Sequence, residues 1–312
     1  MRLLLAGPTA VGKTDLSLHL AEELGIPIIS ADSRQCYKYM DIGTGKASPD
    51  DLTRVKHYNI SIFYPDIVDN ASKFHERALM WEEELSHTCN IYFYVGGSTL
   101  YLESLIRPLD EVPKSNRENL RDLEKLETEF GLAHLYNELR QVDPFYVSKM
   151  DGMNRQRIFR ALDVFMQTGI PFSHFHKQNN DITPSDDTLV FVLNRDRAKL
   201  HQRISKRVDK MMESGLVEEV KSILHMGYSP DLNALQTVGY REIISFLEQK
   251  ISLDRAVELI KRNSRRYAKR QITWFRRWNN VVWLNMDTLD MDKAKRLIID
   301  HIKSVAANGN NR

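Results

Sequence analysis

The sequence predicts an α/β fold in which helices cover both faces of a parallel sheet and an α-helical domain is inserted. Apolar runs of strand length recur along the chain, at residues 3–6, 26–30, 91–95, 189–193 and 281–284. They are continuously apolar rather than alternating, as expected for strands buried on both faces. Helical patterns, such as those at 15–24 and 72–85, separate them. This alternation favours an open parallel sheet.

The interval between the third and fourth predicted strands, roughly 110–187, is too long for a simple crossover. It opens with a capping-box pattern at 115–118 and is broken at Gly131, at Asp143-Pro144 and at Asp151-Gly152. We therefore predict a catalytic core made of residues 1–110 and 188–312, with a helical insertion domain at 111–187.

Composition excludes several classes of protein. The 312 residues carry a net charge of +2, with 42% hydrophobic and 28% charged residues, which is ordinary for a soluble globular enzyme. Cys36 and Cys89 form no metal spacing and no disulfide framework. The apolar runs are too short to span a bilayer, and the first strand leaves no room for a signal peptide. We expect a cytoplasmic monomer with no membrane contact.

A glycine-rich motif, GPTAVGKT at 7–14, lies between the first predicted strand and the first helix. Spacing and context are those of a P-loop, so we expect a P-loop NTPase-like core that binds a di- or triphosphate, ATP at the level of the motif. Backbone N–H groups surround the phosphates, Lys13 adds positive charge, and the Thr14 hydroxyl binds Mg²⁺. The predicted diphosphate-binding residues of this motif are Gly7, Thr9, Ala10, Val11, Gly12, Lys13 and Thr14.

Polar residues follow two further strands, whose carboxyl ends should face the same crevice. Asp32, after the second strand, is a candidate general base, a candidate Mg²⁺ ligand through water, or a helix N-cap. Gly96, Gly97 and Ser98, after the third, bind a second anionic or polar group or form only a tight turn.

Two arginines follow the fourth predicted strand. Arg203 and Arg207 are four residues apart, so they lie on one face of a helix. Facing the crevice, they would clamp a diphosphate and stabilise it as a leaving group. The alternative is a solvated basic face paired with nearby acids.

A basic segment near the C-terminus carries aromatic residues. Residues 261–277 contain eight Lys or Arg and no Asp or Glu. On a helix, Arg262, Arg266, Arg270 and Arg277 share one face, and Tyr267, Gln271, Trp274 and Trp278 share the neighbouring one. This pattern suits phosphate neutralisation with base stacking, as in RNA binding. The alternative is a solvated basic helix whose aromatic residues belong to the core.

Seven motifs in fixed order carry a family resemblance over nearly the whole chain. They are GPTAVGKT (7–14), ADSRQ (31–35), MDIGT (40–44), VGGSTLY (95–101), RALDV (160–164), VGYRE (238–242) and AKRQITWF (268–275). Together they closely resemble the tRNA dimethylallyltransferase (isopentenyltransferase) family. Ser98 stands where that family usually has threonine, which keeps the hydroxyl.

The resemblance implies transfer of a dimethylallyl group from dimethylallyl diphosphate to N6 of the adenosine 3′-adjacent to a tRNA anticodon (position 37). The P-loop would then hold the donor's diphosphate, with Mg²⁺. Lys13 and Arg207, supported by Arg203, would stabilise the departing diphosphate; Asp32 matches the family's general base, and Ser98 would contact the target nucleotide.

The resemblance also implies a set of residues that contact the anticodon stem-loop of tRNA. They lie in four segments and at Ser98, and the set is Asp32, Ser33, Arg34, Gln35, Ser98, Gln156, Arg157, Arg160, Gln236, Gly239, Tyr240, Arg241, Lys269, Arg270, Gln271, Trp274 and Arg277.

Three other functions share parts of this pattern. A free adenine-nucleotide isopentenyltransferase would share the core without an anticodon grip. A P-loop small-molecule kinase would share the motif at 7–14 and Asp32, but it would not explain the C-terminal motif. A non-catalytic P-loop RNA-binding protein would need neither Asp32 nor the arginine pair. The basic segment and the long insertion favour tRNA as the acceptor.

Overall fold

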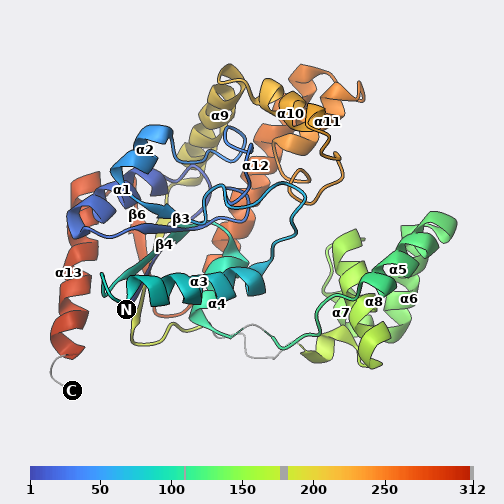
Figure 1. Ribbon diagram of the computed structural model, residues 1–312, viewed down its shortest axis with the longest axis horizontal. Coiled ribbons are helices and arrows are strands. Elements are labelled where there is room, and N and C mark those ends of the chain that lie inside the picture. Colours follow the sequence, from blue (N-terminus) through green and yellow to red (C-terminus); the bar gives the residue numbers. More distant parts are fainter. Residues whose placement is uncertain (109, 176–181, 310–312) are drawn as a thin grey trace. The chain divides into compact units, whose positions relative to one another are not determined.

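The computed structural model describes residues 1–108, 110–175 and 182–309. The chain forms two compact units, one of residues 1–107 with 181–312 and one of residues 108–180 (Figure 1). The predicted insertion, 111–187, thus starts slightly late and ends too late. Residues 182–187 belong to the larger unit, because they lead directly into its sheet.

A six-stranded parallel sheet forms the centre of the larger unit, in the order β3-β2-β4-β1-β5-β6 (Figure 1). The five predicted strands are confirmed as β1 (Arg2–Ala6), β2 (Ile28–Ala31), β4 (Tyr92–Gly96), β5 (Thr188–Asn194) and β6 (Val282–Asn285). The two-residue strand β3 (His57–Tyr58) was not predicted, since it is too short to leave a pattern.

The register of the sheet brings three strand ends to one level. Ala6 of β1 pairs with Gly96 of β4, and Gly96 pairs with Ala31 of β2. The segments that follow β1, β2 and β4 therefore leave the same edge of the sheet. This edge is where a parallel sheet presents its ligand site.

Alternate side chains of β1 enter two different cores. Leu3 and Leu5 pack with α1 (Lys13–Leu24) and α13 (Met291–Gly309) on one face of the sheet. Leu4 and Ala6 pack with α3 (Ala71–Leu85) and α4 (Thr99–Ile106) on the other. Both faces are therefore covered, which explains why these strands read as unbroken apolar runs.

Five further helices complete the larger unit among the described residues. They are α2 (Pro49–Arg54), α9 (Arg197–Glu213), α10 (Leu216–His225), α11 (Tyr240–Leu247) and α12 (Leu253–Phe275). Helices α9 to α12 share a third core with the loop that follows β2. No helix among the described residues is both long and apolar enough to cross a membrane.

The smaller unit is helical, as predicted. It contains α5 (Arg117–Phe130), α6 (Leu132–Val142), α7 (Pro144–Ser148), α8 (Arg155–Thr168) and a 3₁₀ turn, η1 (Phe172–Phe175). Its own core includes Leu123, Leu135 and Ile158. The expected capping box at 115–118 is wrong in detail: the N-cap is Asn116, whose side chain accepts from the N–H groups of Glu118 and Asn119.

Candidate active site

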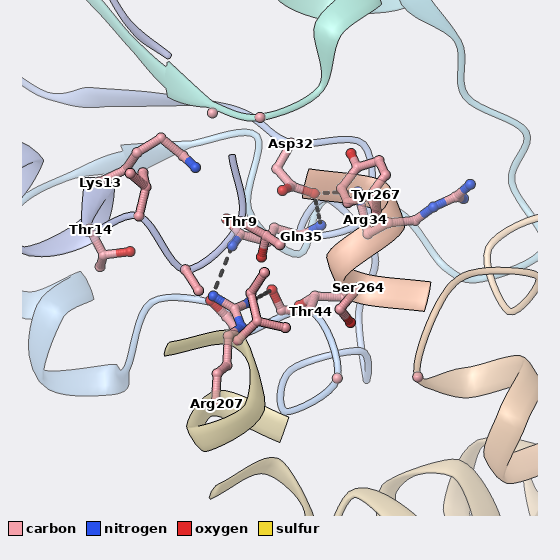
Figure 2. A pocket seen from close by; sticks show the side chains of 18 of the residues that line it. Thr9, Lys13, Thr14, Asp32, Arg34, Gln35, Thr44, Arg207, Ser264 and Tyr267 are labelled. Carbon is pink, nitrogen blue, oxygen red and sulfur yellow. Dashed lines mark hydrogen bonds between the residues drawn. The ribbon is translucent and has the colours of Figure 1, made fainter. Parts of the chain in front are cut away.

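A cavity of about 570 Å³ opens at the strand ends of the larger unit (Figure 2). It is lined by the P-loop, by the turns after β2 and β4, and by parts of α9 and α12. Asp32, Lys13, Thr14 and Arg207 all line it. The structure therefore brings together predicted site residues that are far apart in the sequence.

The P-loop has the backbone shape that an anion needs. Gly12 and Ala10 lie in the left-handed region, at φ 111° and 63°. Gly12 is the N-cap of α1, and no side chain caps that helix end. The N–H groups of its first turn are therefore available to phosphate oxygens.

Two arginines hold the outer side of the P-loop. The Arg203 Nε donates to the Ala10 carbonyl at 2.8 Å, and the Arg195 Nε donates to the Val11 carbonyl at 2.9 Å. Arg195 is fixed in turn by Asp287 at 2.9 Å. Both arginines thereby hold the loop's peptide groups in place. Arg195 was not predicted as a site residue, although its position one residue after β5 resembled that of a strand-end ligand.

Lys13 reaches back across the P-loop. Its ammonium donates to the carbonyls of Gly7 at 2.8 Å and Pro8 at 2.9 Å, which uses two of its three protons. Burial lowers the pKa of Lys13 to about 8, and the nearby charge of Asp32 opposes that shift. An anion in the cavity would stabilise the charged ammonium.

Asp32 uses one carboxylate oxygen to fix its own loop. Its Oδ1 accepts from the backbone N–H groups of Arg34 at 2.8 Å and Gln35 at 3.3 Å (Figure 2). The group it caps is a turn and not a helix. Capping and catalysis are therefore compatible, because one oxygen anchors the side chain and the other remains for a proton.

Ser98 joins the turns that follow β2 and β4. Its hydroxyl accepts from the Ser33 N–H at 2.8 Å and donates to the Ser33 Oγ at 3.2 Å. Tyr267 of α12 lines the same cavity, and burial together with the Asp32 charge raises the pKa of Tyr267 to about 12. The direct contact between Ser98 and a nucleotide stays a prediction.

Arg207 occupies the side of the cavity opposite the sheet edge. One Nη donates to the Thr44 carbonyl at 2.9 Å (Figure 2). Burial lowers the pKa of Arg207, and the charge of Asp32 opposes this shift. The guanidinium stays charged at any ordinary pH, so Lys13 and Arg207 are two cationic groups whose charges interact with the Asp32 carboxylate.

Gln271, a member of the predicted tRNA set, has an internal role. It lines the cavity but is only 2% exposed, and both of its amide atoms are engaged within the protein, so its contact with tRNA stays a prediction. Its Oε1 accepts from the Thr9 N–H at 3.0 Å, and its Nε2 donates to the Gly97 carbonyl at 2.8 Å. Gln271 thus links the P-loop to the turn after β4 from inside the protein.

Tyr240, another member of the predicted tRNA set, also has an internal role. Its side chain is fully buried, and its hydroxyl donates to Glu219 at 2.6 Å. Burial raises the pKa of Tyr240 well above its usual value. A side chain with 0% exposure does not form a surface for RNA, so its part of the VGYRE motif is structural.

Other residues of the predicted tRNA set divide into engaged and exposed groups. Arg160 binds Asp163, Ser115 and the Pro113 carbonyl within the smaller unit, and Trp274 donates to Glu103 at 2.6 Å. Arg34 donates to the Asn233 carbonyl, and Arg241 pairs with Glu242. Two glutamines donate to backbone carbonyls, Gln35 to that of Gly45 and Gln236 to that of Pro230. The exposed members that remain are Gln156, Arg157, Lys269, Arg270 and Arg277. For all of these, contact with tRNA stays a prediction.

The basic C-terminal segment is mostly helical, and α12 ends at Phe275. Trp278 is 4% exposed and belongs to the core, so the core alternative holds for that residue. Arg277 lies over the Trp274 ring, 4.6 Å from its centroid, which leaves one cationic and one aromatic group paired near the helix end. Figure 1 shows α12 running alongside the sheet.

Two models of known protein families match the chain. A family model described as IPP transferase matches residues 35–278. The chain belongs to this family. A model described as isopentenyl transferase matches residues 1–62, which include the P-loop and the turn after β2.

Relatives match along nearly the full length of the chain. The chain is 43% identical to a tRNA dimethylallyltransferase of Thermotoga maritima, over 96% of this chain and 98% of the relative. It is 41% identical to one of Clostridioides difficile, over 96% and 97%. These identities confirm the family expected from the seven motifs.

Solved structures of IPP transferases share the fold. A full-length tRNA isopentenylpyrophosphate transferase from Bacillus halodurans superposes with a TM-score of 0.72 at 33% identity, covering 99% of this chain and 98% of that one. A eukaryotic dimethylallyltransferase acting on tRNA gives a TM-score of 0.76 at 27% identity, covering 97% of this chain and 80% of that one.

Proposed function

We propose that this chain transfers a dimethylallyl group from dimethylallyl diphosphate to N6 of the adenosine 3′-adjacent to the anticodon of tRNA (position 37). The products are N6-(dimethylallyl)adenosine and diphosphate. The observation that carries the proposal is the cavity in which Asp32 lies with Lys13 and Arg207 beside an uncapped helix end. Family membership and the names of the relatives support the choice of substrates.

In this reaction the N6 amine attacks C1 of the dimethylallyl group, and the C1–O bond breaks with its electron pair passing to the diphosphate. The P-loop N–H groups, Lys13 and Arg207 stabilise the charge that develops on this leaving group. Asp32 takes the proton from N6 through the oxygen that does not cap its turn. Removal from water protects the allyl group from hydrolysis.

The chain's residues fit a bound Mg²⁺. Thr14 stands in the first turn of α1 and Asp32 lines the same cavity. Among the described residues no three His, Cys, Asp or Glu side chains form a metal site of their own, so the diphosphate would supply further oxygens. When bound, the ion would neutralise part of the diphosphate's charge.

The acceptor would be presented by the anticodon stem-loop, with its adenine turned out into the cavity. The exposed cations Lys269, Arg270 and Arg277 lie on or just after the same helix that lines the cavity through Gln271. They supply charge for the RNA backbone. We propose that the enzyme works as a cytoplasmic monomer.

One assay separates this proposal from its rivals. Purified protein and Mg²⁺ are incubated with labelled dimethylallyl diphosphate, and unmodified tRNA, AMP or ATP is offered as the acceptor. We expect label in tRNA alone. Label in AMP or ATP but not in tRNA would establish the free-nucleotide enzyme. ATP consumption without prenyl transfer would establish a kinase.

A further inference from the structure

The MDIGT motif at 40–44 takes no direct part in prenyl transfer, yet its loop borders the cavity. Gly43, Thr44 and Gly45 line the cavity wall. The Thr44 carbonyl accepts the hydrogen bond of Arg207 at 2.9 Å. Gly45 lies at φ 58° directly against the Arg207 guanidinium, where a Cβ atom would collide with it. The position of this 41–45 loop therefore decides where Arg207 points.

Glu219 of α10 holds the 41–45 loop. Its Oε2 accepts from the backbone N–H groups of Asp41 at 2.9 Å and Ile42 at 2.7 Å. Its Oε1 accepts from the Gly43 N–H at 3.1 Å. Three successive backbone donors thus converge on one carboxylate, an arrangement typical of an anion-binding nest.

Tyr240 closes this arrangement from α11. Its hydroxyl donates to Glu219 Oε1 at 2.6 Å, and a Cβ atom on Gly43 would come within 2.5 Å of its ring. Glu219 therefore accepts four hydrogen bonds, three of them from the loop. Since bonds to a charged acceptor are about twice as strong as neutral ones, loss of the charge weakens all four together.

We propose that Glu219 is a positioning residue, which holds the 41–45 loop so that the Thr44 carbonyl orients Arg207 toward the diphosphate. The inference rests on the proposed function for its substrate. It does not depend on the acceptor, because the fragment that Arg207 binds is the diphosphate. Glu219 itself reaches the guanidinium only through the loop.

The test measures the affinity of full-length protein for inorganic pyrophosphate with Mg²⁺, together with prenyl transfer. Glu219→Gln should weaken pyrophosphate binding about tenfold and lower kcat by about 10- to 100-fold, the loss that a displacement of about 1 Å produces. The KM for tRNA should stay within about twofold. Glu218→Gln is the control, since Glu218 is an exposed neighbour in the same helical turn whose carboxylate lies 3.8 Å from Lys221.

A double-mutant cycle separates positioning from general destabilisation. In the Arg207→Ala background, where Lys13 and the P-loop still bind pyrophosphate, Glu219→Gln should have no further effect. An equal loss of affinity in both backgrounds, or an unchanged affinity in folded Glu219→Gln, would overturn the proposal. If Glu219→Gln does not fold, Tyr240→Phe removes one of the four bonds and should show a smaller loss with the same dependence on Arg207.

Because pyrophosphate binding needs neither tRNA nor the prenyl group, the two proposals fail differently. A protein that binds pyrophosphate in the expected cycle but prenylates no tRNA would refute the proposed function alone. A protein that prenylates tRNA normally with Glu219→Gln would refute the positioning role alone.

Discussion

Two regions of the molecule carry basic side chains but are built differently. One is the side of the cavity that contains Lys13, Asp32 and Arg207, here called the phosphate wall, and the other is the group of exposed cations near the end of α12. On the wall, Lys13 and Arg207 are held by backbone carbonyls, and burial lowers the pKa of each. At the end of α12, Arg270 and Arg277 are exposed and lie against aromatic rings. Buried, preorganised charges stabilise the charge that develops during a reaction. Exposed charges attract a charged ligand, and salt screens this attraction.

Substitution of Asp32 should have the largest effect, on the rate of prenyl transfer. Asp32→Asn keeps an oxygen that caps the turn but does not take up a proton, so single-turnover prenyl transfer should fall by about 10²- to 10⁴-fold. Binding of tRNA should change little. Asp32→Ala is the matched variant, which should lose the same rate and also the cap, with a lower unfolding free energy. A near-normal rate in Asp32→Asn would exclude a general base here.

A substitution at Gln271 tests whether the hydrogen bonds from α12 to the P-loop and to the turn after β4 stabilise the fold. Gln271→Leu leaves the Thr9 N–H and the Gly97 carbonyl without a partner, which should cost about 1–3 kcal/mol in unfolding free energy for each group. Denaturant unfolding measures this loss. The control is Gln202→Leu on the exposed face of α9. A loss confined to tRNA affinity, with stability intact, would favour the predicted RNA contact over the internal link.

Titration of Lys13 should change protein stability and pyrophosphate affinity in opposite directions as the pH rises. Its pKa is lowered from 10.5 to about 8, so the folded protein binds fewer protons than the unfolded chain between these values. Stability contributed by this group should therefore rise as the pH rises through that window. Pyrophosphate affinity should fall above about pH 8, by up to about tenfold per pH unit, as the ammonium loses its charge.

The matched variant for this test is Lys13→Met, which removes the titrating group. Its pyrophosphate affinity should be low and should not show the decline above about pH 8. Thermal unfolding and calorimetric binding across about pH 7 to 10 measure both quantities, over the range in which lysine titrates. An identical decline in wild type and Lys13→Met would assign the titration to another group.

The exposed cations should give the smallest effect and the strongest dependence on salt. Arg270→Gln with Arg277→Gln should weaken tRNA binding and reduce the slope of log affinity against log salt by about 0.7–0.9 for each phosphate that is no longer neutralised. The rate of prenyl transfer at saturating tRNA should be unchanged. Arg255→Gln, exposed in the first turn of the same helix, is the control. A slope equal to that of wild type would place the RNA elsewhere.

The contrast also explains which predictions succeeded. The five longer strands and the P-loop were predictable, because apolar runs and glycine spacing act on neighbouring residues. Asp32 was predictable too, since a polar residue after a buried strand faces the ligand edge. The strand β3 was missed because two residues are too few to leave a pattern, and the N-cap at Asn116 was missed because the neighbouring Ser115 fits a capping pattern as well.

The sequence by itself determined that this protein has a P-loop core, because the anion-binding backbone is built within eight neighbouring residues, 7–14. Only the tertiary structure decided that Gln271, Tyr240 and Trp278 turn inward, although they lie in or beside motifs rich in RNA-binding residue types. A helical pattern fixes which residues share a face, but partners such as Thr9 and Glu219 come from distant segments. Whether a side chain is buried depends on those distant partners, so a local sequence pattern does not predict it.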